Sequence, residues 1–233
     1  MRIADMNWMQ VEAYLEKDDR CILPLGSTEQ HAYLSLSVDS ILSEKVSVEA
    51  AAPEGVPVFP VLAYGMTPMF KSYPGTISIS MKTYLVILED ILNHMSQQGF
   101  KRILIVNGHG GNSPASNFVG EWQTHNTHMR IQWHDWWRAS KTMKQVRKVD
   151  AIGSHASWME NFPWTRLKGV KMPDVQKKMV NFNHLRQLSP DEAKDYLVDG
   201  NFGGFYQHDD ESMQKIWDVA VAETRDLLVN GWV

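Results

Sequence analysis

The sequence predicts an α/β protein whose sheet is mostly parallel. Apolar runs of strand length alternate with stretches of helical periodicity as far as about residue 133, and this alternation is typical of β-α-β units. Polar loops follow directly after two of the apolar runs, where α/β sheets place their functional sites. The length of 233 residues fits one domain, residues 1–233.

The first third of the chain contains the first two predicted β-α units. The prediction rests on a helical spacing of apolar residues and on two short apolar runs. Pro57 lies inside the second run and favours an edge or irregular strand. The expected elements are a helix over 6–16, a strand over 21–26, a helix over 40–52 and a strand over 56–62.

The middle of the chain continues the alternation. Strict apolar alternation predicts a half-exposed strand, and Gly99 is a plausible C-cap of the helix that follows it. Asn112 or Ser113 is expected to cap the helix after the 102–106 strand. The expected elements are strands over 76–80, 102–106 and 129–133 and helices over 81–99, 155–164 and 211–230.

Composition excludes several classes of protein. The net charge of −4 and the lack of a Lys/Arg stripe argue against a nucleic-acid partner. Cys21 is the single cysteine, so neither an internal disulfide nor a cysteine-based zinc site is expected. The N-terminal segment carries charges throughout and no stretch reaches a membrane span of ~20 apolar residues. We therefore expect a cytoplasmic protein without a membrane partner.

The first polar loop contains Glu29 and His31, two residues apart, after the 21–26 strand. In an extended segment both side chains leave the same face and can converge on metal ions. Asp39 follows eight residues after His31, and a carboxylate with two oxygens can bridge two cations. Taken alone, a Glu-x-His pair is more often solvated surface or hydrogen-bonded loop.

The second polar loop, residues 107–112, presents His109 among three glycines. The glycines permit close backbone approach and positive φ angles, and Asn107 and Asn112 can fix the loop through bonds to its backbone. A flexible or phosphate-binding turn is the alternative interpretation. Together the two loops offer only nitrogen and oxygen ligands, which suit Zn, Mn or Fe.

At this point the chain resembles the creatininase family. The resemblance rests on residues 23–31, Asp39, the Tyr73-Pro74-Gly75-Thr76 segment, residues 106–112, and His155 with Glu160, and it covers about residues 20–165. It implies a three-layer α/β/α sandwich, a homo-oligomer (a hexamer in the family), and two divalent metal ions per subunit that activate water. Zinc is favoured, with Mn or Fe as alternatives.

The resemblance also implies roles for individual residues. His155 matches a proton donor, and Glu160 matches an acidic residue expected in the catalytic set and as a further ligand. The residues that match metal ligands are Glu29, His31, Asp39 and His109.

Two departures from the family pattern bear on the substrate. The family usually has a second histidine after the first and reaches its aspartate nine residues on, whereas here Ala32 to Val38 is one residue shorter and lacks that histidine. Creatinine-hydrolysing members also carry a glutamate where this chain has Gly111. Creatinine is therefore not the expected substrate.

Three functions follow from these patterns. The first is hydrolysis of an amide-type C–N bond in a small cyclic or formylated metabolite. The alternative is hydrolytic C–C ring opening of a cyclic ketone such as an oxidised inositol of the 3-dehydro-scyllo-inosose type. The third is a metal-binding protein without catalysis.

Tryptophan is unusually frequent, with nine residues, several of them between Trp122 and Trp164. This aromatic segment is expected either to line a substrate pocket or to form core or subunit interface. The remaining histidines have no partner motif and are expected at the surface or in single hydrogen bonds: His94, His125, His128, His134, His184 and His208.

Overall fold

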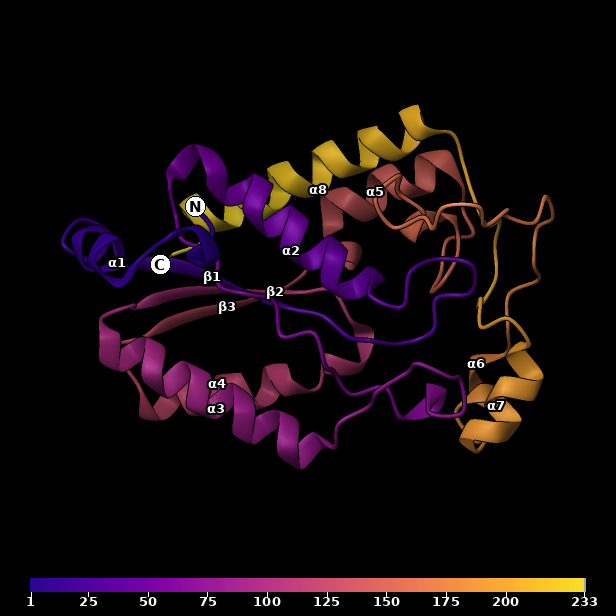
Figure 1. The fold of residues 1–233 in the computed structure, drawn as a ribbon, viewed down its shortest axis with the longest axis horizontal. Coiled ribbons are helices and arrows are strands. Elements are labelled where there is room, and N and C mark those ends of the chain that lie inside the picture. The colour runs from indigo at the N-terminus through magenta and orange to yellow at the C-terminus, as the bar shows by residue number, and fades with distance from the viewer. Residues whose placement is uncertain (233) are drawn as a thin grey trace.

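A computed structural model describes residues 1–232. Three parallel strands form the sheet in the order β1-β2-β3, and helices cover both of its faces (Figure 1). The strands are β1 (Arg20–Leu25), β2 (Arg102–Asn107) and β3 (Arg130–Asp135). Their sequences are rich in apolar residues because a parallel sheet is buried on both faces. The predicted three-layer α/β/α sandwich is confirmed.

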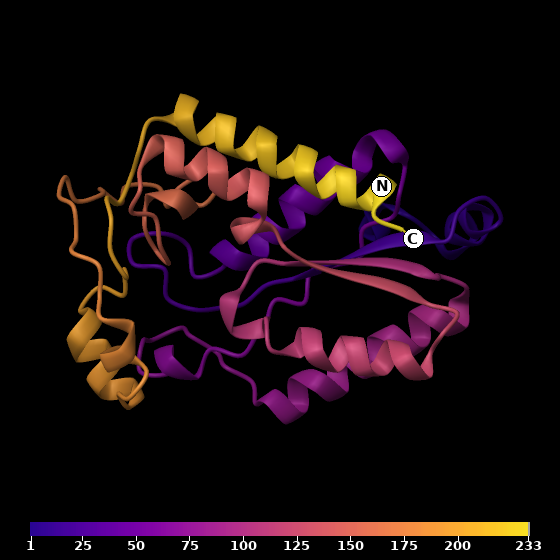
Figure 2. The same ribbon diagram turned by 180° about the vertical axis from the view of Figure 1, so that it is seen from behind.

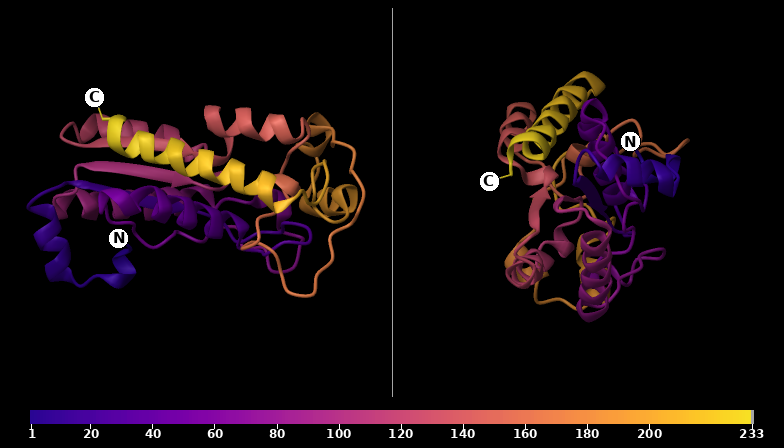
Figure 3. Two further views of the ribbon diagram at one scale, coloured as in Figure 1. Left: turned by 90° about the horizontal axis from the view of Figure 1, so that it is seen from above. Right: turned by 90° about the vertical axis from the view of Figure 1, so that its left-hand side faces the viewer.

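One face of the sheet is covered by α3 (Met81–Gln98) and α4 (Ala115–His125), and the other by α2 (Val38–Ala51), α5 (Ser140–Val149) and α8 (Asp210–Asn230). The view from behind shows α8 running beside α5 (Figure 2), and the end-on view separates the three layers (Figure 3, right). No helix within residues 1–232 is long and apolar enough to span a membrane.

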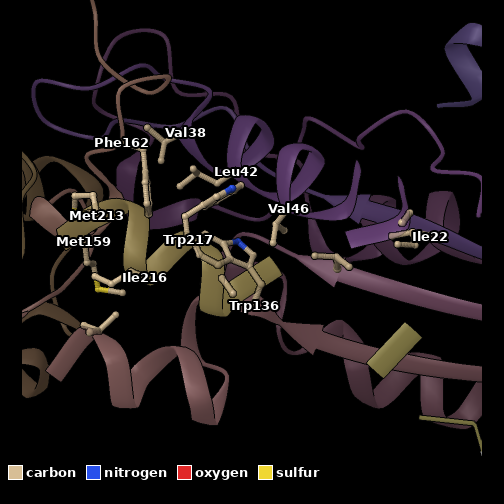
Figure 4. Close-up of a cluster of buried hydrophobic side chains, with 14 of the residues drawn as sticks. Ile22, Val38, Leu42, Val46, Trp136, Met159, Phe162, Met213, Ile216 and Trp217 are labelled. Carbon is tan, nitrogen blue, oxygen red and sulfur yellow. The ribbon is translucent and has the colours of Figure 1, made fainter. Parts of the chain in front are cut away.

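Each face of the sheet has its own apolar core. The core under α3 and α4 includes Tyr84, Leu88 and Phe100. The core under α2 and α8 is rich in aromatic residues, among which Trp136 and Trp217 meet edge to face with ring centroids 5.7 Å apart (Figure 4). Burying such large apolar surfaces is the main source of stability here.

Local sequence accounts for the helix ends that were predicted. Asn7 forms a capping box at the start of α1 (Trp8–Leu15), and Gly99 ends α3 in the left-handed region at φ 105°. Both satisfy backbone groups that a helix end leaves without partners. The final helix also lies where it was predicted.

Two predicted strands are absent as regular strands within the described residues. Residues 56–62 pair along the outer edge of β1 only through isolated bridges, because Pro57 and Pro60 have no backbone N–H to donate. Residues 76–80 likewise form isolated bridges, one of them between Ile77 and Thr28. This short segment is tied to the loop after β1 instead of to the sheet.

The predicted helix over 155–164 is wrong. Only a 3-10 turn, Trp158–Glu160, forms there. Ala156 has a positive φ of 59°, and the backbone N–H of Trp158 donates to Phe205 O at 2.9 Å. These backbone groups are therefore committed to long-range contacts that a helix would break.

Other differences concern the second half of the chain. The N-cap of α4 is Pro114, and no side-chain cap forms, because the Asn112 side chain is used elsewhere. The sequence patterns also missed α5 and two short helices, α6 (Phe182–Leu185) and α7 (Pro190–Leu197). These two helices lie at the end of the molecule opposite the chain termini (Figure 1).

Candidate metal centre

The four ligands suggested by the two loops meet beyond the carboxyl ends of β1 and β2. Glu29 and His31 lie in the loop after β1, Asp39 in the first turn of α2, and His109 in the loop after β2. All four side chains are at least nine-tenths buried. The register aligns Leu25 with Asn107 across the sheet, which brings the two loops side by side.

Asp39 is at the centre of the cluster. Its Oδ1 lies 3.1 Å from His31 Nε2, and its Oδ2 lies 2.9 Å from His109 Nδ1. Each carboxylate oxygen thus faces a different imidazole. The loop from Ala32 to Val38 places Asp39 beside both histidines, and Ala32 in this loop has a positive φ of 51°.

Backbone carbonyls bond the far nitrogen of each imidazole. His31 Nδ1 lies 3.1 Å from Glu29 O, and His109 Nε2 lies 3.0 Å from Met66 O. A nitrogen bonded to a carbonyl must carry the hydrogen, which leaves the other nitrogen of each ring facing the carboxylates. Metal-ligating histidines are commonly oriented in this way.

Glu160 and His155 join the cluster from the segment after α5. Glu160 Oε2 lies 3.7 Å from His31 Nε2 and accepts a 2.6 Å hydrogen bond from the Ala156 backbone. His155 Nδ1 lies 3.6 Å from Glu29 Oε1. The structure therefore brings all six residues singled out in the sequence to one place.

These residues fit divalent metal ions. Two ligand groups share one carboxylate, Glu29–Asp39–His109 and His31–Asp39–Glu160, and within each the ligand atoms lie within 4.8 Å of one another. A third group joins His155 to Glu29 and His31. Glu29 Oε2 is buried and lacks a hydrogen-bond partner within residues 1–232, a costly state that a cation would relieve.

The electrostatics of the cluster favour positive charge. Burial works against an ionised Glu29, yet His109 beside it lowers the pKa of that carboxyl. Burial also disfavours a charged His31, but Asp39, Glu160 and Glu29 outweigh it and raise its pKa to about 10. The carboxylates raise the pKa of His109 in the same way.

The two residues from the later segment titrate differently. Burial raises the pKa of Glu160 to about 7. Burial, aided by the nearby His31, lowers the pKa of His155 to about 4. Without metal ions, His155 is therefore a neutral imidazole at pH 7, whereas His31 is protonated.

The loop after β2 is held by asparagine side chains, as predicted. Asn107 Nδ2 donates to His109 O at 2.7 Å and to Asp135 Oδ1 at 2.7 Å. Asn112 Nδ2 donates to Gly26 O, and its Oδ1 accepts from the backbone of Met66. The loop is thus tied to β1, to β3 and to the segment after Gly65.

Two of the three glycines of this loop, Gly108 and Gly111, allow close approach of neighbouring backbone, whereas a Cβ at Gly110 would make only an ordinary contact with Trp137. A Cβ at Gly108 would overlap Asp39 O, and one at Gly111 would overlap Met66 O. The predicted use of positive φ angles is wrong, because Gly108, Gly110 and Gly111 are absent from the residues with positive φ. The constraint is therefore packing against neighbouring backbone.

Sequence reasoning missed several supporting contacts. Ser27 Oγ donates to Asp39 Oδ2 at 2.6 Å, and Thr76 Oγ1 accepts from the Gln30 backbone at 3.0 Å. Gln30 in turn contacts His155, with the two Nε2 atoms 2.8 Å apart. Ser27 lies two residues before Glu29 and Gln30 lies between Glu29 and His31, and this closeness in sequence was the only signal available.

A cavity of about 610 Å³ opens onto the cluster. Glu29, Asp39, His109, His155 and Glu160 line one part of it. The tryptophan segment divides between the two predicted roles. Trp137 lines the cavity, whereas Trp136 and Trp158 belong to the core.

The chain belongs to the creatininase family. The family model, described as creatinine amidohydrolase, matches residues 4–228. The fold and the grouping of acidic residues and histidines agree with this assignment.

Three curated relatives show partial similarity. The creatinine amidohydrolase of Pseudomonas putida is 32% identical over 48% of this chain and 45% of its own length. The mycofactocin precursor peptide peptidase of Mycolicibacterium smegmatis is 34% identical over 40% of each chain. The 3-dehydro-scyllo-inosose hydrolase of Thermotoga maritima is 27% identical over 45% of this chain and 34% of its own length. These matches span less than half of each relative.

Solved structures show the same fold over nearly the whole chain. The structure described as "Creatininase Mn" superposes with a TM-score of 0.80 and 19% identity, covering 97% of this chain and 96% of that one. A mutant creatininase of the "Zn-Zn type" gives a TM-score of 0.79 with 19% identity, covering 97% of this chain and 96% of that one.

Proposed function

We propose that this protein is a divalent-metal-dependent hydrolase that cleaves an amide-type C–N bond in a small cyclic or formylated metabolite other than creatinine. The observation that carries the proposal is the position of Asp39, whose two oxygens face His31 and His109 at 3.1 and 2.9 Å. A shared carboxylate between two ligand groups is what a two-metal hydrolytic site requires.

The residues divide into two candidate ion sites. Glu29, Asp39 and His109 would hold one ion, and His31, Asp39 and Glu160 would hold the other. Zinc is the favoured metal, with manganese or iron as alternatives, because the donors are nitrogen and oxygen. When bound, such ions lower the pKa of water toward about 7 and polarise a carbonyl group.

His155 is proposed to move the proton. Its burial keeps the ring neutral, and its Nδ1 lies 3.6 Å from Glu29 Oε1, on the side of the ligand cluster. A neutral imidazole can accept a proton from the attacking water and then give it to the departing nitrogen. Gln30 holds the opposite edge of the ring, since its backbone carbonyl oxygen lies 3.1 Å from His155 Nε2.

The structure supports a substrate other than creatinine. Gly111 has no room for the glutamate that creatinine-hydrolysing members carry, because Met66 O and the His109 ring occupy that space. Glu160, 3.7 Å from His31, belongs to the ligand cluster and does not take the place of that glutamate.

Ring opening of a cyclic ketone is the alternative, supported by the similarity to the inosose hydrolase of Thermotoga maritima. The wall of the cavity is rich in Met and Phe side chains, which suits a polyhydroxylated ring poorly. This favours the amide reaction. Product analysis separates the two, because amide cleavage yields a carboxylate and a freed N–H group, in one molecule for a cyclic amide and in two for a formamide, whereas ring opening of a ketone yields a carboxylate without a freed N–H group.

Metal analysis combined with a substrate screen tests the proposal. Protein reconstituted with zinc, manganese or iron is expected to bind two ions per chain, and Glu29→Gln and His109→Ala are each expected to lower that number. Unchanged metal content in both variants would refute the metal centre. Full metal content without hydrolysis of any amide or cyclic ketone would support the non-catalytic alternative.

We also propose that the enzyme is cytoplasmic and forms a homo-hexamer, which rests on the family assignment. Light scattering of the purified protein measures its mass. A monomer at micromolar concentration would refute the hexamer.

A further inference from the structure

We propose that the outer part of the cavity binds a bulky, uncharged apolar group of the substrate, next to the bond that is cleaved. This inference rests on the proposed function and adds the class of substrate to it. It comes from the large apolar residues that line the cavity together with the ligand cluster. We call this set the apolar wall: Met66, Met69, Met143, Met159, Met179, Phe70, Phe182, Phe202 and Trp137.

Five of the nine wall residues are methionines. They come from separate parts of the chain, with Met66 before η3 (Pro68–Phe70), Met143 in α5 and Met179 before α6. Methionine side chains are flexible and polarizable, so they adapt to apolar groups of different shape. Their convergence on one cavity from distant segments indicates a built apolar surface.

The aromatic residues of the wall connect this surface to the proposed proton carrier. Phe70 stacks on His155 with ring centroids 4.8 Å apart and an interplanar angle of 15°. Phe202 lies on the same imidazole at 4.8 Å, and Phe182 meets Phe202 edge to face. An apolar group on this wall would therefore lie beside His155, at the reacting end of the cavity.

The charged groups around the cavity already have partners. Arg138 is the one Lys or Arg of the lining within residues 1–232, and it forms an ion pair with Asp135. Asp135 is itself held by Asn107 and Trp133. Since the carboxylates of the ligand cluster face histidines, the wall offers no free charge to attract a charged substituent.

The size of the cavity supports a substrate larger than the hydrolysed group alone. Its volume of about 610 Å³ falls within the range of roughly 300–1,000 Å³ typical of sites that enclose most of a drug-sized ligand. The ligand cluster forms part of the lining, and the apolar wall forms most of the rest.

The test uses hydroxamates that differ in their tails, because the hydroxamate group binds divalent metals whichever tail it carries. Acetohydroxamate and 3-phenylpropionohydroxamate would be titrated by calorimetry into the metal-loaded full chain. We expect the phenyl tail to tighten binding at least roughly tenfold, as burial of an aromatic ring in an apolar site should. Glutaric acid monohydroxamate, with a charged tail, is expected to bind more weakly than the phenyl compound.

Two wall variants locate the tail. Met143→Gln and Met179→Gln keep side-chain length but add a polar amide, and each should reduce the preference for the phenyl tail at least about threefold. Their affinity for acetohydroxamate should not change, which also shows that they are folded and loaded. Met81→Gln, on the exposed start of α3, is the matched control and should leave both affinities unchanged.

The outcomes distinguish the two proposals. If neither hydroxamate binds the loaded protein, the metal centre of the proposed function fails. If acetohydroxamate binds but the phenyl tail adds nothing, or the charged tail binds best, the metal centre stands and the apolar substrate is refuted. A phenyl preference that survives both wall variants also refutes the inference, because the tail then lies elsewhere.

Discussion

The ligand cluster and the apolar wall share one cavity but are built in different ways. Most of the cluster comes from two short loops directly after β1 and β2, and buried hydrogen bonds to backbone fix its side chains. The wall comes from residues 66–70 and from scattered positions between 137 and 202, on short helices and irregular segments. Of the wall residues, only Trp137 directly follows a strand, β3.

This difference separates chemistry from selectivity. Strand ends hold ligand atoms in fixed positions, which is what metal binding requires. Loops and short helices can change their side chains without disturbing the sheet, so the same centre can serve different substrates. Changes in the cluster should therefore abolish reaction, whereas changes in the wall should alter which compound is bound.

The largest effect is expected from Asp39→Asn. The amide has one acceptor oxygen and no charge, so it cannot serve both ligand groups. We expect metal content to fall below two ions per chain and turnover to drop about a thousandfold or more, since each ion contributes several kcal/mol to transition-state stabilisation. Metal analysis and the rate with the best amide substrate measure both quantities.

Asp90→Asn is the matched control, because Asp90 is exposed on α3. It should retain both ions and full activity. If Asp39→Asn also retains both ions, Asp39 is not a shared ligand, and the division between cluster and wall loses its main support.

The next largest effect is expected from His155→Ala. This residue contacts both regions, since it lies 3.6 Å from Glu29 and stacks on Phe70. Loss of a proton carrier typically costs between about a hundredfold and ten-thousandfold in rate. We expect such a loss with two ions retained. If metal is lost as well, His155 belongs to the ligand group with Glu29 and His31, and its role as a proton carrier is refuted.

The sequence allowed prediction of the cluster because its residues follow strands. Glu29, His31 and His109 are polar residues that come after apolar runs typical of buried strands. Asp39 lies at the start of the next predicted helix. The resemblance to a known family added Glu160 and His155. The structure then places all six within one cluster.

Apart from Trp137, which lies in the aromatic segment expected at a pocket, the wall could not be predicted, because no local pattern marks its other residues. Met143, Met179 and Phe202 are each ordinary apolar residues in their own segments, and only tertiary packing brings them together. The segment from 155 to 164 has an apolar spacing that suggested a helix, but its backbone bonds to Phe205 instead. Long-range pairing of this kind overrides local propensity.

A smaller effect, on stability, is expected from a buried histidine outside the cavity. His134 in β3 lies against Thr224, and burial lowers its pKa to about 4. In the native state the His134 imidazole therefore stays neutral, whereas in the unfolded chain it binds a proton below about pH 6.5. The titration of His134 therefore leaves the free energy of unfolding unchanged above about pH 6.5 and lowers it between about pH 6.5 and 4, by up to roughly 3 kcal/mol.

His134→Gln removes this titration. Between about pH 7.5 and pH 4.5 the free energy of unfolding of the variant should fall by about 2 kcal/mol less than that of the wild type, as measured by urea unfolding without metal. His125→Gln, at an exposed position of α4, should behave like the wild type. Equal losses in His134→Gln and wild type would show that burial of His134 does not outweigh the nearby carboxylates of Glu223 and Asp135.

An effect of similar size is expected from one added methyl group beside the cluster. At Gly111 a Cβ would overlap Met66 O, whereas at Gly120, inside α4, it would meet nothing within 4 Å. Gly111→Ala should therefore lower the free energy of unfolding by about 2 kcal/mol, and Gly120→Ala should raise it by about 0.5–1 kcal/mol. Urea unfolding of the metal-free protein measures both. Met66 begins the apolar wall and its carbonyl oxygen also accepts the bond from His109, so a tolerated alanine at Gly111 would mean that this contact between the two regions can shift without loss of stability.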